Sequence, residues 1–190
     1  VPRRREARPR PARAPEVTAV RYGVISDVHA NLPALEVVLS ELSRIGVDEY
    51  ACAGDLVGYG PQPNECVGVI RELGVPCVAG NHDLIVLGEL SEDRCERLAR
   101  NSLRWTREVL DPRTRDFLSQ LPRQLELPGG VVVTHASLDD PQEYILRTEQ
   151  AATQLARLAE RYSATRILIV GYTHRAFAYG GISAQTRLPS

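Results

Sequence analysis

Ser26-Asp27-Val28-His29-Ala30-Asn31 carries the first polar residues after a predicted strand. The strand is the apolar run Val20-Arg21-Tyr22-Gly23-Val24-Ile25, which reads as short, buried and bounded by turn residues. An Asp and a His two positions apart at a strand end can bind a divalent metal from one side. By itself the pair is weak evidence, because an Asp after a strand often caps the next helix.

The rest of the chain alternates predicted strands with predicted helices. Further strands are predicted over 47–53, 75–79, 125–127, 131–133 and 166–170. Helices are predicted over 33–46, 63–73, 92–110, 112–121 and 148–162, and Pro128-Gly129-Gly130 predicts a hairpin. In the helix over 92–110 we expect Leu98, Leu103 and Trp105 to form an apolar face. This alternation predicts an α/β layered fold.

Residues of the types that bind metals follow these strands. In layered α/β folds, ligands collect outside the carboxyl ends of the strands. All four histidines of the chain belong to the set, which consists of Asp27, His29, Asp55, Asn81, His82, His135 and His174. Their joint occurrence at strand ends, more than any one of them, indicates a metal site.

Most of these residues also have a simpler interpretation. Asp55 is a candidate for an anionic ligand shared by two cations, but Gly54-Asp55 is also an ordinary turn sequence. Asn81 offers a neutral oxygen ligand. His82 and Asp83 resemble an acid with an orienting carboxylate, although His82 also fits a plain loop residue and Asp83 a helix N-cap. A single strand-end histidine is often only a hydrogen-bonded structural residue.

Composition limits the class of protein. The chain has 190 residues, of which 43% are apolar and 25% charged, as in an ordinary soluble domain, which we place at residues 19–190. No run is long and apolar enough to span a bilayer, and no secretory signal is visible. Two of the four cysteines, Cys52 and Cys77, lie in apolar runs and read as small buried hydrophobes, so we expect a cytoplasmic protein.

Charge is concentrated at the N-terminus. Residues 1–18 hold six Arg and two Glu, a formal charge of +4, which leaves −5 for the remainder. This Arg- and Pro-rich tail is predicted to be disordered. A basic tail can touch nucleic acid or an anionic membrane, but a solvated extension is the simpler interpretation. Because the domain itself is mildly acidic, we expect neither specific nucleic-acid binding nor membrane association.

In chain order, the strand-end motifs resemble those of the calcineurin-like metallophosphoesterase superfamily, most closely its small bacterial and archaeal phosphodiesterase branch. The motifs are Asp27-Val28-His29, Gly54-Asp55-Leu56-Val57-Gly58, Gly80-Asn81-His82-Asp83, Thr134-His135 and Gly171-Tyr172-Thr173-His174. The resemblance covers about residues 20–180. It implies a four-layer α/β/β/α sandwich of two mixed sheets flanked by helices, with a di-metal centre at the strand ends.

The resemblance also implies which residues bind the metals. One ion would be held by Asp27, His29, Asp55 and His174, and the second by Asp55, Asn81, His135 and one further histidine. That histidine is missing, because the family usually reads Gly-His-Thr-His where this chain has Tyr172. A neutral phenol is a poor ligand for Mn²⁺ or Zn²⁺, so the second site is expected to be weakened. We expect two divalent ions, Mn²⁺ first, with Fe, Zn, Ni or Mg as alternatives.

The implied activity is hydrolysis of a phosphate ester, most simply a phosphodiester, by a hydroxide that bridges the metals. His82, oriented by Asp83, would stabilise the transition state or protonate the leaving group, and Arg175 would contact the phosphate. A solvated surface residue is the alternative for Arg175. The substrate would be a small-molecule ester or a nucleotide. The segment over 137–144 is similar to one in diadenosine tetraphosphatase-like members, too loosely to name a nucleotide.

Two features favour a second hypothesis, a scaffold or binding protein that keeps the fold but has lost turnover, as in the small retromer subunit. One is Tyr172, and the other is the short segment after His174. The short segment predicts a sheet with a shortened C-terminal edge, or a truncated chain. A dinucleotide-binding domain is set aside, because no Gly-x-Gly-x-x-Gly follows the first strand. A homo-oligomer stays open.

Overall fold

The structure is a computed structural model that describes residues 20–180. The predicted disordered tail, residues 1–18, lies outside the described residues. The helices are α1 (Leu32–Ile45), α2 (Pro63–Glu72), α3 (Asn81–Leu87), α4 (Arg97–Val109), α5 (Pro112–Ser119) and α6 (Thr148–Arg161). The strands are β1 (Tyr22–Ile25), β2 (Glu49–Cys52), β3 (Gln124–Leu127), β4 (Val131–Thr134) and β5 (Ile167–Val170).

The strands form two sheets. In the first sheet β1 and β2 run parallel, from the pair Tyr22–Glu49 to the pair Ile25–Cys52. The predicted strand over 75–79 is reduced to a single parallel bridge between Cys52 and Cys77. In the second sheet β3 and β4 form the predicted antiparallel hairpin, and β5 pairs parallel with β4. The second sheet is therefore mixed, whereas the first is parallel throughout the described residues, which corrects the expectation of two mixed sheets.

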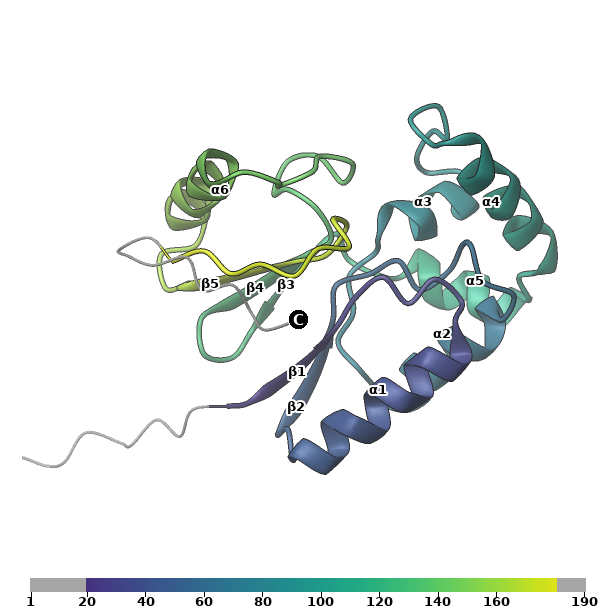
Figure 1. Ribbon diagram of the computed structural model, residues 1–190, viewed down its shortest axis with the longest axis horizontal. Helices are drawn as coiled ribbons and strands as arrows, with labels where there is room; N and C mark the ends of the chain where they lie inside the picture. The colour runs from purple at the N-terminus through teal and green to yellow at the C-terminus, as the bar shows by residue number, and fades with distance from the viewer. Residues whose placement is uncertain (1–19, 181–190) are drawn as a thin grey trace, which may run out of the picture.

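Apolar side chains on both faces of each sheet produce four layers. Between the sheets, Ala51 of β2 and the neighbouring Val78 pack in one cluster with Val131 and Val133 of β4. Helices α1 to α5 lie on the side of the first sheet that faces away from the second, and their apolar residues form one core cluster with Ile25 and Cys52 of that sheet (Figure 1). Helix α6 covers the outer face of the second sheet, where Val132 packs with Leu158. The predicted α/β/β/α sandwich is confirmed. The order of layers brings the loops after β1, β2, β4 and β5 to one edge.

Helix α3 was missed by the sequence analysis. It has seven residues, too few for a helical periodicity to show, and it begins at the site motif itself. Its cap residue is Gly80, which carries no capping side chain, and instead the Asp83 carboxylate accepts a hydrogen bond from the Gly80 N–H at 2.9 Å. Asn81 and His82 are thus buried residues of a first helical turn rather than of a loop.

The predicted apolar face of α4 is also corrected. Leu103 is fully buried, but Leu98 is 74% exposed and Trp105 is 41% exposed. The buried face consists instead of Ala99, Leu103 and Thr106, which follow one another at the helical spacing of three to four residues. Over residues 20–180, no helix is long and apolar enough to cross a membrane.

The two leucines of α4 give a test of this packing. Leu103→Ala should lower the free energy of unfolding by about 2–5 kcal/mol, because it leaves a cavity in the core beside the first sheet. Leu98→Ala, the matched control on the exposed face, should change it by about 0.5 kcal/mol or less. Urea denaturation followed by circular dichroism measures both. Equal losses in the two variants would contradict the assignment of the faces.

Candidate metal centre

The backbone is strained where the strand-end loops meet. Five non-glycine residues of the centre lie in the left-handed region, with φ of 54° at Asp27, 49° at His29, 55° at Asp55, 67° at Tyr172 and 50° at His174. Each costs on the order of 1 kcal/mol relative to a right-handed backbone. Such conformations persist only when the surroundings enforce them, and they concentrate at functional sites. Here the sharp turn after each strand directs the next polar side chain towards the centre.

Backbone hydrogen bonds hold the first two loops together. The Asp27 N–H donates to Gly54 O at 3.0 Å, and the His29 N–H donates to Asp55 O at 2.9 Å. Asp83 fixes the loop after β2. Its Oδ1 accepts hydrogen bonds from the backbone N–H groups of Leu56 at 2.9 Å and Val57 at 3.2 Å. The two ligand-bearing loops are therefore one hydrogen-bonded unit.

These contacts correct the role expected for Asp83. Its carboxylate is fully buried and bonds backbone N–H groups of two segments, whereas His82 Nδ1 is buried without a hydrogen-bond partner in the structure. Asp83 therefore positions the loop that carries Asp55 and does not orient His82. Burial, and then the nearby charge of Asp55, raise the pKa of Asp83 to about 7.

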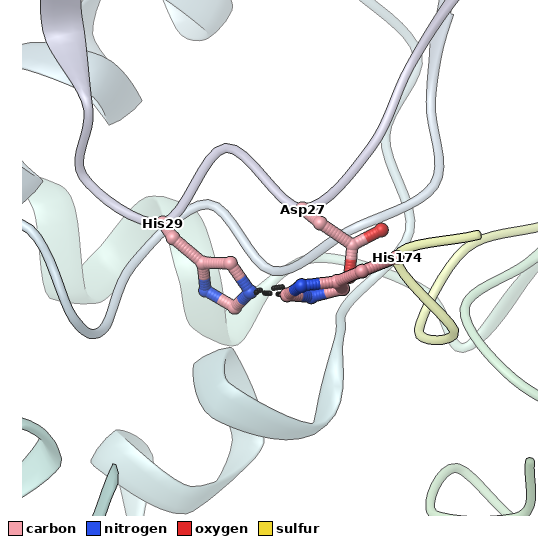
Figure 2. Close-up of side chains that lie close together, drawn as sticks. All are labelled: Asp27, His29 and His174. Carbon is pink, nitrogen blue, oxygen red and sulfur yellow. Dashed lines mark hydrogen bonds and ion pairs between the residues drawn. The ribbon is translucent and has the colours of Figure 1, made fainter. Parts of the chain in front are cut away.

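The first group of candidate ligands is Asp27, His29 and His174 (Figure 2). His174 Nε2 lies 3.1 Å from His29 Nε2 and 3.2 Å from Asp27 Oδ1, and His29 Nε2 lies 3.9 Å from Asp27 Oδ1. Figure 2 shows His174 reaching from the segment after β5 to the two residues that follow β1. Residues separated by almost the whole described chain thus converge on one point.

The second group is Asp55, Asn81 and His135. His135 Nε2 lies 3.0 Å from Asn81 Oδ1 and 3.3 Å from Asp55 Oδ2. Asp55 Oδ1 accepts the His82 backbone N–H at 2.8 Å, which leaves Oδ2 directed at the histidines. That same Oδ2 lies 3.8 Å from His29 Nε2 of the first group. Asp55 is therefore placed to be shared by the two groups.

The chemistry of the donors fits divalent cations. His29 Nδ1 lies 3.2 Å from Val57 O, and His135 Nδ1 lies 2.7 Å from Ala53 O. An Nδ1–H that donates to a carbonyl leaves the Nε2 lone pair free, which is the usual arrangement of metal-binding histidine. Ligands bonded at about 2.1 Å to one ion lie roughly 3–3.5 Å apart. The shortest separations within each group are of this size.

Buried charges shift the pKa values of these groups. Burial disfavours the charge on both Asp55 and His135, but their mutual attraction outweighs it, raising the pKa of His135 to about 9 and holding the pKa of Asp55 below its usual range. Burial lowers the pKa of His29, and it lowers the pKa of His82 to about 4. Without a metal, the raised pKa keeps His135 protonated beside the Asp55 carboxylate. A cation bound at these two residues would displace that proton.

Tyr172, at the position of the missing histidine, does not reach the ligand atoms with its hydroxyl. That hydroxyl donates to Gln142 O at 3.4 Å, while the ring lies edge-on to His135 with centroids 5.4 Å apart. Burial raises the pKa of Tyr172 above its ordinary value, so the phenol stays neutral. Its backbone N–H donates to the Asp27 carboxylate at 3.2 Å. Tyr172 thus orients a candidate ligand through its backbone.

A cavity of about 290 Å³ adjoins the centre. It is lined by His29, Asp55, Asn81, His82 and His174, and also by three tyrosines and by Arg94. Arg94 was missed by the sequence analysis, because it lies in no motif and the chain has 23 arginines. Arg175 lines a different cavity, of about 450 Å³, which is bordered by β5 and α6. The structure thus brings together every predicted ligand, but not Arg175.

Comparison with known proteins identifies relatives of this arrangement. A family model described as calcineurin-like phosphoesterase matches residues 20–184. An uncharacterised protein of Methanocaldococcus jannaschii is 41% identical over 127 residues, which are 64% of this chain and 52% of that protein. The crystal structure of a metallophosphoesterase from Sphaerobacter thermophilus is 40% identical, with a TM-score of 0.67 over 84% of this chain and 63% of that one.

A third relative is a protein of known crystal structure that is described as a proposed diadenosine tetraphosphatase. It is 31% identical, with a TM-score of 0.52, and the match covers 66% of this chain and 53% of that one. The chain therefore spans about half to two thirds of the length of these relatives. The residues that the family model matches, 20–184, contain the whole set of candidate ligands, since all of them lie between residues 27 and 174.

A glycine in the second group gives a test of the geometry. In Gly80→Ala the new Cβ would lie 2.0 Å from Asp55 Oδ1 and 2.3 Å from Asp55 N, so the shared ligand must move. We expect Mn²⁺ affinity to fall by about 10–100-fold, as when a group that positions a ligand is lost. Gly68→Ala is the matched control, because its Cβ meets nothing within 4 Å. Isothermal titration calorimetry measures both, and an unchanged affinity in Gly80→Ala would contradict the assigned centre.

Proposed function

The chain belongs to the calcineurin-like phosphoesterase family, and from that premise we propose that it is a metal-dependent phosphoesterase that hydrolyses phosphodiesters. The observation that carries the proposal is the convergence of two ligand groups on the shared Asp55 carboxylate, beside an open cavity. The activity and the substrate are proposals for this chain, because it spans only part of its relatives' length.

The residues present would hold two divalent ions. Asp27, His29, Asp55 and His174 supply the first site, and Asp55, Asn81 and His135 supply the second, with Mn²⁺ as the expected metal and Fe, Zn, Ni or Mg as alternatives. When bound, such ions lower the pKa of a coordinated water and polarise the phosphoryl oxygens. The two carboxylates only partly neutralise two divalent cations, so the centre retains positive charge that favours an anionic ester.

His82 is the proposed proton donor or hydrogen-bond donor to the phosphate. It borders the cavity, and its ring lies 4.7 Å from that of His29. Because burial lowers its pKa to about 4, the free protein holds His82 neutral near pH 7. A bound phosphate anion raises the pKa of a neighbouring imidazole. Cations bound at the centre would oppose this rise, so His82 would act through its neutral ring as a hydrogen-bond donor unless the phosphate outweighs their charge.

Arg94 is a second proposed contact for the anionic substrate. It borders the cavity from the segment between α3 and α4, and its guanidinium lies 2.8 Å from Asp140 Oδ2. The Arg94 side chain is mostly exposed and that of Asp140 partly exposed, and ion pairs near the surface contribute little stability, so Arg94 can exchange this partner for a phosphate at small cost. Arg175, the contact predicted from its place next to His174, lies beside the other cavity, and its role in substrate binding stays a prediction.

The alternative function is a scaffold with lost turnover. The observation in its favour is Tyr172, whose neutral phenol cannot replace an imidazole in the second site. Metal content separates the two functions. About two equivalents of tightly bound Mn²⁺ with hydrolysis would support the enzyme, whereas one or none without hydrolysis would support the scaffold.

We make three further predictions about this chain. They are a cytoplasmic location, a small-molecule or nucleotide ester as substrate, and no specific nucleic-acid binding. A homo-oligomer also stays a prediction.

Asp55→Asn tests the proposed activity. The neutral amide removes a shared anionic ligand, so hydrolysis of bis(4-nitrophenyl) phosphate with Mn²⁺ should fall by about 100-fold or more. Asp116→Asn, at an exposed position on α5, removes the same charge far from the ligands in sequence and should keep wild-type activity. Absorbance of released nitrophenolate measures the rate. A wild type that hydrolyses no phosphodiester with Mn²⁺ or Ni²⁺ would contradict the proposal.

Tyr172→His tests the weakened second site. Restoring an imidazole should raise the affinity for the second Mn²⁺ by about 10–100-fold, because one more direct ligand becomes available. Tyr172→Phe keeps the ring and removes the hydroxyl, and it should leave metal binding unchanged. Calorimetric titration gives the stoichiometry and affinity of each variant. If Tyr172→His binds metal no better than wild type, position 172 does not face the second site.

A further inference from the structure

Two tyrosine rings are stacked at the border of the cavity. The rings of Tyr144 and Tyr172 have centroids 4.2 Å apart and an interplanar angle of 19°. Tyr172 is the inner member of the pair. Its backbone N–H donates a hydrogen bond to the Asp27 carboxylate, and its ring packs against that of His135. Tyr144 is the outer member, and it is 49% exposed. The stack therefore begins on the candidate metal ligands and ends with an exposed aromatic ring.

A third tyrosine borders the same cavity from the loop after β2. The ring of Tyr59 lies 4.7 Å from that of His29 and 4.8 Å from that of His82, and the residue is 48% exposed. Its left-handed backbone, with φ of 60°, is fixed by a hydrogen bond from its N–H to Ser102 Oγ at 2.6 Å. This fixed conformation keeps an exposed aromatic ring beside the candidate centre.

The placement of these rings needs an explanation beyond hydrolysis. Binding and polarising a phosphate group requires the metals, His82 and a cation, but no aromatic surface. Exposed tyrosines fixed in place offer flat apolar area at a low cost in conformational entropy, and they stack on the π-face of any nucleobase. The cavity volume of about 290 Å³ is at the small end of ligand pockets, which suits one mononucleotide-sized group.

We propose that Tyr144, supported by Tyr172, is a specificity-determining residue that stacks on the flat aromatic group of the phosphate ester, a nucleobase or an aryl group. The inference rests on the proposed function, because it takes the phosphate to lie at the candidate metal centre. The proposed stacking site also assigns a role to Tyr172. A tyrosine here supports the stack from the inside, and its hydroxyl bonds Gln142 in the segment that carries Tyr144.

A pair of ligands that differ only in the base tests the proposal. Calorimetric titration with Mn²⁺ present would compare adenosine 5′-monophosphate with ribose 5-phosphate. Stacking on one aromatic side chain implies that the nucleotide binds about tenfold tighter. Tyr144→Leu should remove this preference, and Tyr144→Phe should retain it. Leu146→Ala is the control in the same segment, because Leu146 is exposed and does not line the cavity.

The outcomes are separable from those of the proposed function, since binding is measured without turnover. Equal affinities for the two ligands, or no binding of either, would overturn the inference, as would a preference that persists in Tyr144→Leu. A preference for the nucleotide that depends on Tyr144, in a protein that hydrolyses no ester, would support the stacking site and count against catalysis. Thermal unfolding of each variant checks that it is folded. If Tyr144→Leu is unfolded, the affinities of the wild-type protein for the two ligands, together with those of Tyr144→Phe, decide whether the stacking site exists.

Discussion

The buried carboxylate of Asp55 is the interaction on which the arrangement of the centre depends. It accepts the backbone N–H of His82 at the start of α3, contacts His135 at the end of β4, and lies near His29 in the loop after β1. These three partners come from the first sheet, from a helix beside it and from the second sheet. One carboxylate therefore joins the two halves of the sandwich at the edge where their strands end.

An ionised carboxylate in the interior is costly unless it is paired and hydrogen-bonded. The chain offsets that cost for Asp55 with one imidazole and one N–H. For Asp83 three backbone N–H groups offset it only in part, since burial still raises the pKa of Asp83 to about 7. Adjacent loops hold seven non-glycine residues in left-handed conformations. A domain selected only for stability gains nothing from two buried carboxylates and this strain. Both follow directly if the loops exist to present ligands to cations.

The sequence predicted the ligands because they depend on rules that act locally. A strand end is recognisable, and parallel strands bring their carboxyl ends to one edge, so Asp27 and Asp55 could be placed together. His135 and His174 follow β4 and β5, the parallel pair of the second sheet, in the same way. Arg94 and the contacts of Asp83 could not be found, because they depend on how distant loops fold back. Leu98 was misassigned for a related reason, since hydrophobicity alone does not say which side of a helix meets the core.

Tyr172 shows why a motif position can carry two meanings. Compared with the family pattern, it is a lost ligand, and the second metal site should be weaker for it. In the structure the tyrosine at this position extends the aromatic surface of the cavity. Its ring stacks on that of Tyr144, and its hydroxyl donates a hydrogen bond to Gln142 O in the segment that carries Tyr144. A histidine that bound metal would have to turn towards Asn81 and His135 and could not support that stack. Metal affinity and aromatic surface at this position are therefore alternatives, and the packing of Tyr172 against Tyr144 supports the second for this chain.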